Sequence, residues 1–161
     1  MTKNLETSEV EKAKWRKAQE QSRKTATWAK TMTKVIISKN NKKGPFWHVI
    51  NFLGPDKCES RGIVDLLAIR KNQSVHSAPL KRGDLFEIVL IQVKGGKAMR
   101  PSADERERLR IVAKEYGATT ILLSEWKQGT RAKFHRLVDD EWDEDVDPAE
   151  VFGKKVNSAK P

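Results

Sequence analysis

The residues with the clearest chemical potential are Asp65, Gln92 and Lys94, because each is a polar group inside an apolar, strand-like segment. Asp65 stands in GIVDLLAIR, and the other two end FEIVLIQVK. An ionised group is costly to bury without a partner or a metal ion. Side chains alternate along a strand, so Gln92 and Lys94 share one face, and a neighbouring strand in suitable register would bring Asp65 beside them. The pattern predicts a cluster of a carboxylate, an amide and an ammonium group.

Such a cluster suits phosphodiester hydrolysis, in which oxygen ligands hold a hard divalent cation. We expect Asp65, the side-chain oxygen of Gln92 and the carbonyl of Val93 to be the metal ligands. Lys94 would orient the attacking water and stabilise negative charge in the transition state. Mg²⁺ is the expected cofactor, with Mn²⁺ as a substitute. The alternative is a structural ion pair between Asp65 and Lys94, with Gln92 bonded to a neighbouring backbone group.

The two segments together resemble a known nuclease motif. RGIVDLLAIRK followed by VLIQVKGG is similar to the PD-(D/E)xK motif, especially as it occurs in Holliday-junction resolvases and related restriction-endonuclease-like folds. The resemblance covers residues 46–138. It implies a central mixed β-sheet flanked by helices, with the acidic residue on one strand and the carboxylate-x-lysine pair on the next. It also implies a metal-dependent endonuclease acting on DNA, including structured or branched DNA, and a homodimer.

The chain departs from this family at Gln92, where the family most often has Glu. Loss of that charge should weaken metal binding unless another carboxylate contributes. Glu59 is the first candidate, because it has the same strand parity as Asp65 if that strand extends so far back. Glu20 is the second, since related nucleases often supply a helical Glu. Glu87 has the opposite parity to Gln92 and is expected to point away.

The charge of the chain indicates a polyanionic partner. Lys and Arg outnumber Asp and Glu by 32 to 22, and the net charge is +10. DNA is the expected partner, with RNA as an alternative, and binding should be salt-sensitive. The resemblance places Ser60 and Arg61 nearest the scissile phosphate. The other basic residues expected to contact nucleic acid are Lys42, Lys43, Lys57, Lys97 and Arg100.

Two other functions compete with an active nuclease. The first is a nuclease-like module that binds nucleic acid without cutting it, which Gln92 favours. The second is an accessory factor whose basic helix docks on an acidic protein partner. Chemistry at the lone Cys58 is disfavoured, because no activating base or set of zinc ligands stands at a characteristic spacing.

The fold class predicted from the segments is α/β. A basic helix is expected over residues 8–31, either as a solvated helix or as a phosphate-contacting arm. Residues 102–117 form the clearest helix, which Ser102 and Glu105 should cap. Strands are predicted at residues 46–54, 62–71, 84–96, 118–126 and 132–138. An antiparallel meander is the simplest connection of the second and third, which a polar loop joins.

The organisation predicted from these elements has three parts. Residues 1–34 would form a helical extension, residues 35–138 the nuclease-like core, and residues 139–161 an acidic and then basic tail that is peripheral or disordered. The chain contains no apolar run long enough to span a membrane and only one cysteine. A reducing, cytoplasmic location is therefore expected.

Overall fold

The computed structural model describes residues 3–42, 44–52, 62–74 and 76–153, with side chains in the first helix described from Glu9 onward. It is an α/β structure with a mixed six-stranded sheet in the order β1-β2-β3-β4-β5-β6. The elements are α1 (Lys3–Asn40), β1 (His48–Asn51), β2 (Leu66–Lys71), β3 (Phe86–Gly95), α2 (Ala103–Glu115), β4 (Thr120–Trp126), β5 (Lys133–Val138), β6 (Glu141–Trp142) and α3 (Pro148–Phe152).

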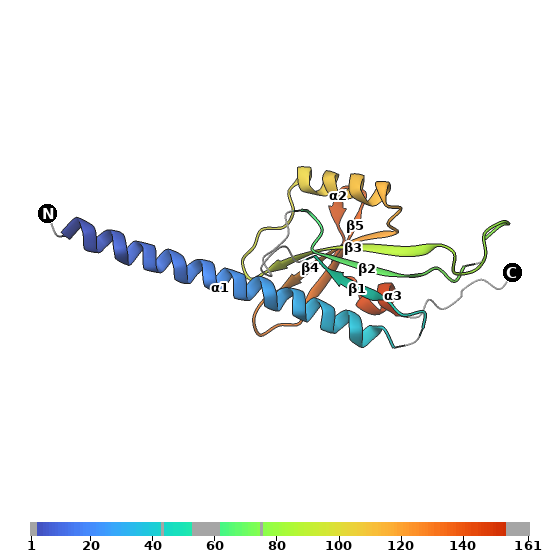
Figure 1. Ribbon diagram of the computed structural model, residues 1–161, viewed down its shortest axis with the longest axis horizontal. Helices are drawn as coiled ribbons and strands as arrows, with labels where there is room; N and C mark the ends of the chain where they lie inside the picture. The colour runs from blue at the N-terminus through green and yellow to red at the C-terminus, as the bar shows by residue number, and fades with distance from the viewer. Residues whose placement is uncertain (1–2, 43, 53–61, 75, 154–161) are drawn as a thin grey trace.

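The sheet combines two antiparallel arms with one parallel pair. β1, β2 and β3 form an antiparallel meander, in which β2 and β3 pair as predicted. Helix α2 then carries the chain over one face of the sheet, so that β4 returns parallel to β3. β5 and β6 continue with antiparallel pairing. Figure 1 shows α1 along the face opposite α2, which gives helices on both sides of the sheet.

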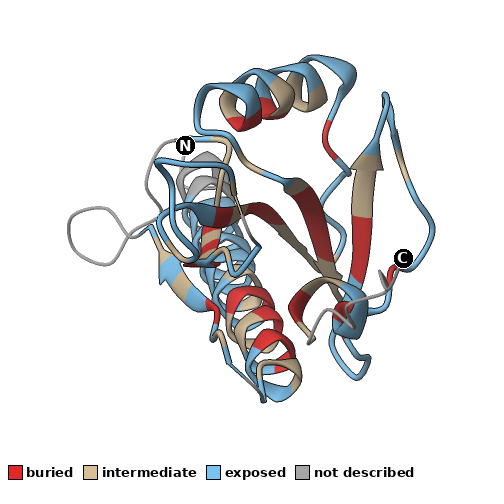
Figure 2. Ribbon diagram, turned by 90° about the vertical axis from the view of Figure 1, so that its right-hand side faces the viewer, coloured by how far each residue is buried: buried red, intermediate tan, exposed pale blue. Residues whose placement is uncertain are grey.

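Two clusters of apolar side chains make the core, one on each face of the sheet. The cluster under α1 and α3 includes Ile37, Ile91 and Phe134. The cluster under α2 includes Leu90 and Leu109. Because Leu90 and Ile91 are consecutive, β3 is apolar on both faces, as expected for a strand in the middle of a sheet covered by helices. Figure 2 shows buried residues along the strands and in the second half of α1.

Helix α1 is longer than the sequence predicts, because it continues to Asn40. Ile36 and Ile37 have weak helix propensity, but both are buried against the sheet, and this packing outweighs propensity. The side chains of residues 9–24 are exposed, and this part of α1 projects beyond the sheet in Figure 1. The predicted boundary at residue 34 falls inside the helix, after the buried Thr33.

The segment predicted as a peripheral tail is part of the core up to residue 153. Phe152 on α3 is 2% exposed, and its ring lies 5.7 Å from that of Trp47 and 6.1 Å from that of Phe134. Val146 is also buried and forms an isolated bridge with Phe134. The prediction failed here because these apolar side chains occur singly among acidic residues, with no helix or strand period. Residues 154–161 lie outside the described residues.

Among the helices of the described residues, none is long and apolar enough to cross a bilayer.

Candidate functional site

Asp65 immediately precedes β2. The sequence predicted it in the middle of a strand. The strand begins one residue later, at Leu66, which pairs with Ile91. The Asp65 N–H still donates a hydrogen bond of 3.0 Å to the Ile91 carbonyl. This register places Asp65 opposite Gln92 on β3, as the cluster requires.

Both carboxylate oxygens of Asp65 have contacts. Oδ2 accepts a hydrogen bond of 2.7 Å from the backbone N–H of Val93. Oδ1 lies 3.4 Å from Nζ of Lys30, which comes from α1. The Asp65 side chain is 25% exposed and that of Lys30 is 9% exposed. The carboxylate is therefore held in a fixed position, with a positive charge beside it and one side open to solvent.

Gln92 and Lys94 project from the same face of β3, and the partners of the Asp65 carboxylate are Lys30 and the Val93 N–H. Gln92 is 5% exposed, and its Oε1 has no hydrogen-bond partner within the described residues. Lys94 is partly exposed and forms no ion pair with any described residue. The structural alternative of an Asp65–Lys94 pair, with Gln92 bonded to the backbone, is therefore wrong: Lys30 is the partner of Asp65, and the Gln92 oxygen is unpaired.

A cleft of about 710 Å³ brings these residues together. Asp65, Gln92, Val93 and Lys94 form one wall of the cleft. The other lining residues come from α1, from the turns beside β2 and β3, and from the first turn of α2; they are Gln21, Ser22, Thr25, Ala26, Gly62, Gly95, Gly96, Lys97, Ala98 and Glu105. Glu105 was identified in the sequence only as a capping residue. It does cap α2 with Ser102, and its position in that first turn also puts it at the cleft.

The glycines that follow Lys94 allow α1 to approach the sheet closely. A Cβ on Gly95 would lie 3.0 Å from the Thr25 carbonyl oxygen and 3.1 Å from the Ala29 Cβ. Gly96 has a φ of 64°, which favours glycine. The sequence left open whether this pair admits a substrate or simply ends a strand. In the structure it is α1 that makes the close approach.

The oxygen atoms of the cleft can be compared with the needs of a hard cation. Asp65 offers a carboxylate, Gln92 a buried amide oxygen without a hydrogen bond, and Val93 a carbonyl. Mg²⁺ and Mn²⁺ accept oxygen ligands of these kinds. No group of three His, Cys, Asp or Glu side chains suited to a metal occurs among the described residues. The donors therefore fit a divalent cation, with Asp65 beside Gln92 and Val93. The carboxylate of Glu105 also lines the cleft, and its Oε2 accepts a hydrogen bond from the Ser102 N–H.

Glu20, the second candidate for an additional metal-binding carboxylate, does not lie at this site. Glu20 forms an ion pair of 2.7 Å with Lys24 on the exposed side of α1 and does not line the cleft. The hydrogen bond and the charge of Lys24 hold the pKa of the Glu20 carboxyl below its ordinary value. Glu87 points away, as expected, and binds Arg70 at 2.6 Å.

The residues expected to contact nucleic acid lie in different parts of the structure. Lys97 is exposed at the cleft. Arg100 is committed to an ion pair with Glu125 at 2.6 Å. Lys42 follows the end of α1 and lies 17 residues beyond Thr25, on the order of 25 Å along the helix axis. The remaining predicted residues, Lys43, Lys57, Glu59, Ser60 and Arg61, lie outside the described residues.

Comparison with protein-family models, curated proteins and solved structures finds no match to this chain. The interpretation of the site therefore depends on its geometry and on the short motif.

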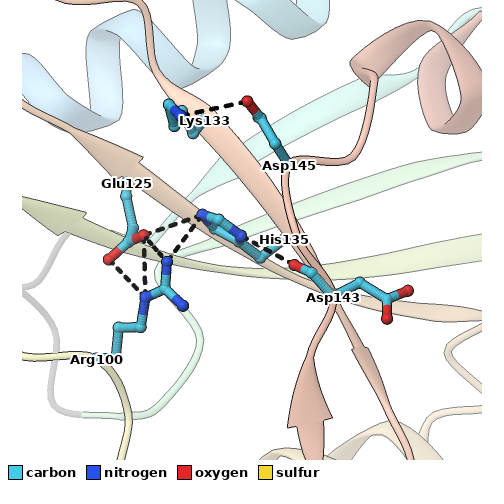
Figure 3. Close-up of polar contacts among 6 residues, drawn as sticks. All are labelled: Arg100, Glu125, Lys133, His135, Asp143 and Asp145. Atoms are coloured by element: carbon cyan, nitrogen blue, oxygen red, sulfur yellow. Dashed lines mark hydrogen bonds and ion pairs between the residues drawn. The ribbon is translucent and has the colours of Figure 1, made fainter.

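Sequence analysis missed a second polar cluster, centred on Glu125 (Figure 3). Arg100 donates to both Glu125 oxygens, at 3.1 and 2.6 Å, and His135 Nε2 lies 2.9 Å from Oε2. The other ring nitrogen of His135 lies 2.9 Å from the Asp143 carbonyl oxygen, so the ring is held between two acceptors. His135 itself is 4% exposed. The signal available in the sequence was a charged residue at the end of the apolar strand ATTILLSEW.

The Glu125 cluster adjoins the cleft through Lys94. Parallel pairing sets Lys94 beside Glu125, and both line a smaller cleft of about 160 Å³. Partial burial raises the pKa of Glu125, but the hydrogen bonds and charge of Arg100, together with the charge of His135, outweigh this effect. The net result is a Glu125 pKa below its ordinary value of 4.5. Glu125 is therefore ionised at neutral pH and occupied by Arg100 and His135.

Proposed function

We propose that this chain is a divalent-metal-dependent endonuclease of the PD-(D/E)xK type, which hydrolyses phosphodiester bonds in DNA, including structured or branched DNA. The observation that carries the proposal is the wall of the cleft, where Asp65, Gln92, Val93 and Lys94 meet and the buried Gln92 oxygen has no partner in the described structure. A homodimer belongs to the proposal through the resemblance alone, and light scattering in solution tests it.

The arrangement of the elements supports this proposal. The sheet is mixed and has helices on both faces, and β2, β3, α2 and β4 follow one another in the strand, strand, helix, strand order that accompanies the motif. Asp65 stands at the start of β2, while Gln92 and Lys94 stand on the adjacent β3. The positions of Asp65 and Lys94 agree with the resemblance. Gln92 departs from it, because the family usually has Glu there.

Each residue of the cleft wall has a distinct role in this proposal. Asp65, Gln92 and Val93 would hold Mg²⁺, which when bound polarises a phosphate and acidifies a coordinated water. Among the described residues no carboxylate pairs with the Lys94 ammonium group, because Asp65 binds Lys30 and Glu125 binds Arg100 and His135. Lys94 can therefore donate to the attacking water and to the negative charge that develops on the phosphate.

A basic stripe on α1 supports nucleic acid as the partner. Lys12, Arg16 and Arg23 are exposed, and Lys30 follows Lys12 by 18 residues, which is about five full helical turns. These four side chains consequently share one side of the helix, and the stripe leads from the projecting end of α1 to the carboxylate of Asp65. Together with the net charge of +10, it offers a path for a phosphate backbone toward the cleft.

The test is cleavage of labelled duplex, single-stranded, flap and four-way-junction DNA, and of RNA, in Mg²⁺ or Mn²⁺. We expect the wild type to cut at least one DNA substrate only when metal is present. Asp65→Ala and Lys94→Ala should both abolish cutting, while Lys81→Ala, on the exposed β2–β3 hairpin at the other end of these strands, should not. Absence of cutting on every substrate, despite measurable binding, would contradict the proposal.

That contrary result would support a second candidate, a nuclease-like module that binds nucleic acid without cutting it. Its specific support is the charge of the site, where one carboxylate is already paired with Lys30 and the family's usual Glu is Gln92. This candidate predicts salt-sensitive binding of nucleic acid that is unchanged by chelators.

A further inference from the structure

The ammonium group of Lys30 lies at the carboxylate where a catalytic cation is expected. Its Nζ is 3.4 Å from Asp65 Oδ1, and both side chains are largely withdrawn from solvent. A carboxylate buried to this degree needs a positive charge nearby. In the described structure Lys30 supplies that charge, so Asp65 does not require a metal for the fold to be stable.

The position of Lys30 is fixed by the residues around it on α1. Ala29 and Thr33 are fully buried, and the hydroxyl groups of Thr33 and Ser124 lie 2.7 Å apart. Gly95 lets this part of the helix sit directly on the end of β3. The helix backbone therefore cannot withdraw from Asp65 without breaking core packing.

We propose that Lys30 is a built-in competitor of the divalent cation, which lowers the affinity of the Asp65 site for metal. The inference rests on the proposed function only in that it concerns the same cation site. An ammonium group and a divalent ion repel each other, and both would compete for Asp65 Oδ1. The other carboxylate oxygen, Oδ2, already accepts a hydrogen bond from the Val93 N–H. Metal binding must therefore either displace the Lys30 ammonium or proceed against its charge.

Removal of this charge should increase metal affinity. The Lys30 ammonium lies 3.4 Å from Asp65 Oδ1, and at this range its repulsion of a divalent ion is strong even after screening by solvent. We expect Lys30→Met to bind Mn²⁺ about tenfold more tightly than the wild type, or better. Lys30→Arg keeps the charge and should keep the low affinity.

The experiment is calorimetric titration of the full chain with Mn²⁺ in the absence of nucleic acid. Lys17→Met is the matched control, since Lys17 is exposed on the same helix, 13 residues from Lys30, about 20 Å along the axis. It should leave the affinity unchanged. Lys30→Met combined with Asp65→Asn should lose the gain, which would locate the cation at Asp65.

Melting temperature provides a second readout for variants of reduced stability. Without metal, Lys30→Met leaves Asp65 without its ion-pair partner, so the variant should melt below the wild type. With saturating Mn²⁺ it should recover more stability than the wild type does. If Lys30→Met does not fold, Lys30→Gln replaces it. Equal or weaker Mn²⁺ binding by the folded variant would overturn the inference, as would a gain that survives Asp65→Asn.

These outcomes separate the inference from the proposed function. Tighter Mn²⁺ binding by Lys30→Met, in a chain that cuts no nucleic acid, would uphold the inference and reject the nuclease. Metal-dependent cutting by the wild type, with unchanged Mn²⁺ affinity in Lys30→Met, would do the reverse.

Discussion

Glu125 lies beside Lys94 on the neighbouring parallel strand, because β3 and β4 pair with these two residues in register. The carboxylate does not neutralise the lysine, since Arg100 and His135 occupy its oxygens. Glu125 therefore contributes to the cleft indirectly, through the residues that it binds. Glu125 anchors the segment after β3 through Arg100 and leaves the Lys94 ammonium available.

The stability contributed by Glu125 should depend on pH. Its pKa in the folded chain lies below the ordinary 4.5, so the contribution is complete above about pH 4.5 and disappears as the pH falls through the folded-state value. Glu125→Gln removes this contribution. We expect the variant to melt at a lower temperature than the wild type at pH 7. This difference in melting temperature should shrink as the pH falls below about 4.5. The exposed Glu115→Gln is the control; a difference that is constant with pH would contradict the assignment.

The close approach of α1 to β3 predicts that a side chain at Gly95 destabilises the fold. In Gly95→Ala the new Cβ would meet the Thr25 carbonyl oxygen at 3.0 Å, and the helix would have to shift. We expect a loss of about 1–3 kcal/mol in the free energy of unfolding, the usual range for overpacking. Gly44→Ala, where the Cβ has only ordinary contacts, is the control in urea denaturation. Equal stability of the two variants would show that the helix is not tightly seated.

The aromatic contacts of Phe152 predict that α3 is integral to the fold. Phe152→Ala removes a ring that is 2% exposed and packs on Trp47 and Phe134. The expected loss is about 3–5 kcal/mol in the free energy of unfolding. Tyr116→Ala, at a side chain that is 70% exposed, should change it by less than about 0.5 kcal/mol. A small effect of Phe152→Ala would contradict the assignment of α3 to the core.

The basic stripe on α1 predicts a specific change in the salt dependence of binding. Lys12→Gln, Arg16→Gln and Arg23→Gln combined should reduce the slope of log K against log salt concentration for duplex DNA by about 2–3, since each phosphate contact contributes about 0.9. Three substitutions at the β2–β3 hairpin, Lys71→Gln, Lys81→Gln and Arg82→Gln, change the charge equally as a control. Equal effects of the two triple variants would mean that the stripe is a solvated surface.

The local sequence was sufficient to predict most of the elements and the residues of the cleft wall. The α/β class and the antiparallel pairing of β2 with β3 are confirmed, because apolar runs of strand length and turn residues mark them clearly. The predicted capping box at Ser102 and Glu105 is present, because such a motif depends on neighbouring residues alone.

The remaining features depend on contacts between distant segments. Lys30 could not be assigned to Asp65, because on a lysine-rich helix nothing in the sequence distinguishes this buried lysine from the exposed ones. Glu125 acquires its role from a parallel register and from Arg100, 25 residues away. Phe152 packs on Trp47 from the other end of the chain, and its surrounding acidic residues hide it from pattern analysis.

The most direct test of the proposed site is the single-turnover cleavage rate of Asp65→Asn in Mn²⁺, on whichever DNA substrate the wild type cuts, with binding measured in parallel. The substitution keeps the shape of the side chain and removes its charge. We expect the rate to fall about 100-fold or more, as for loss of a main electrostatic group, while the Kd for DNA does not rise. The exposed Asp104→Asn should retain full activity. An Asp65→Asn variant that cuts at the wild-type rate would contradict the assignment of this cleft as the active site.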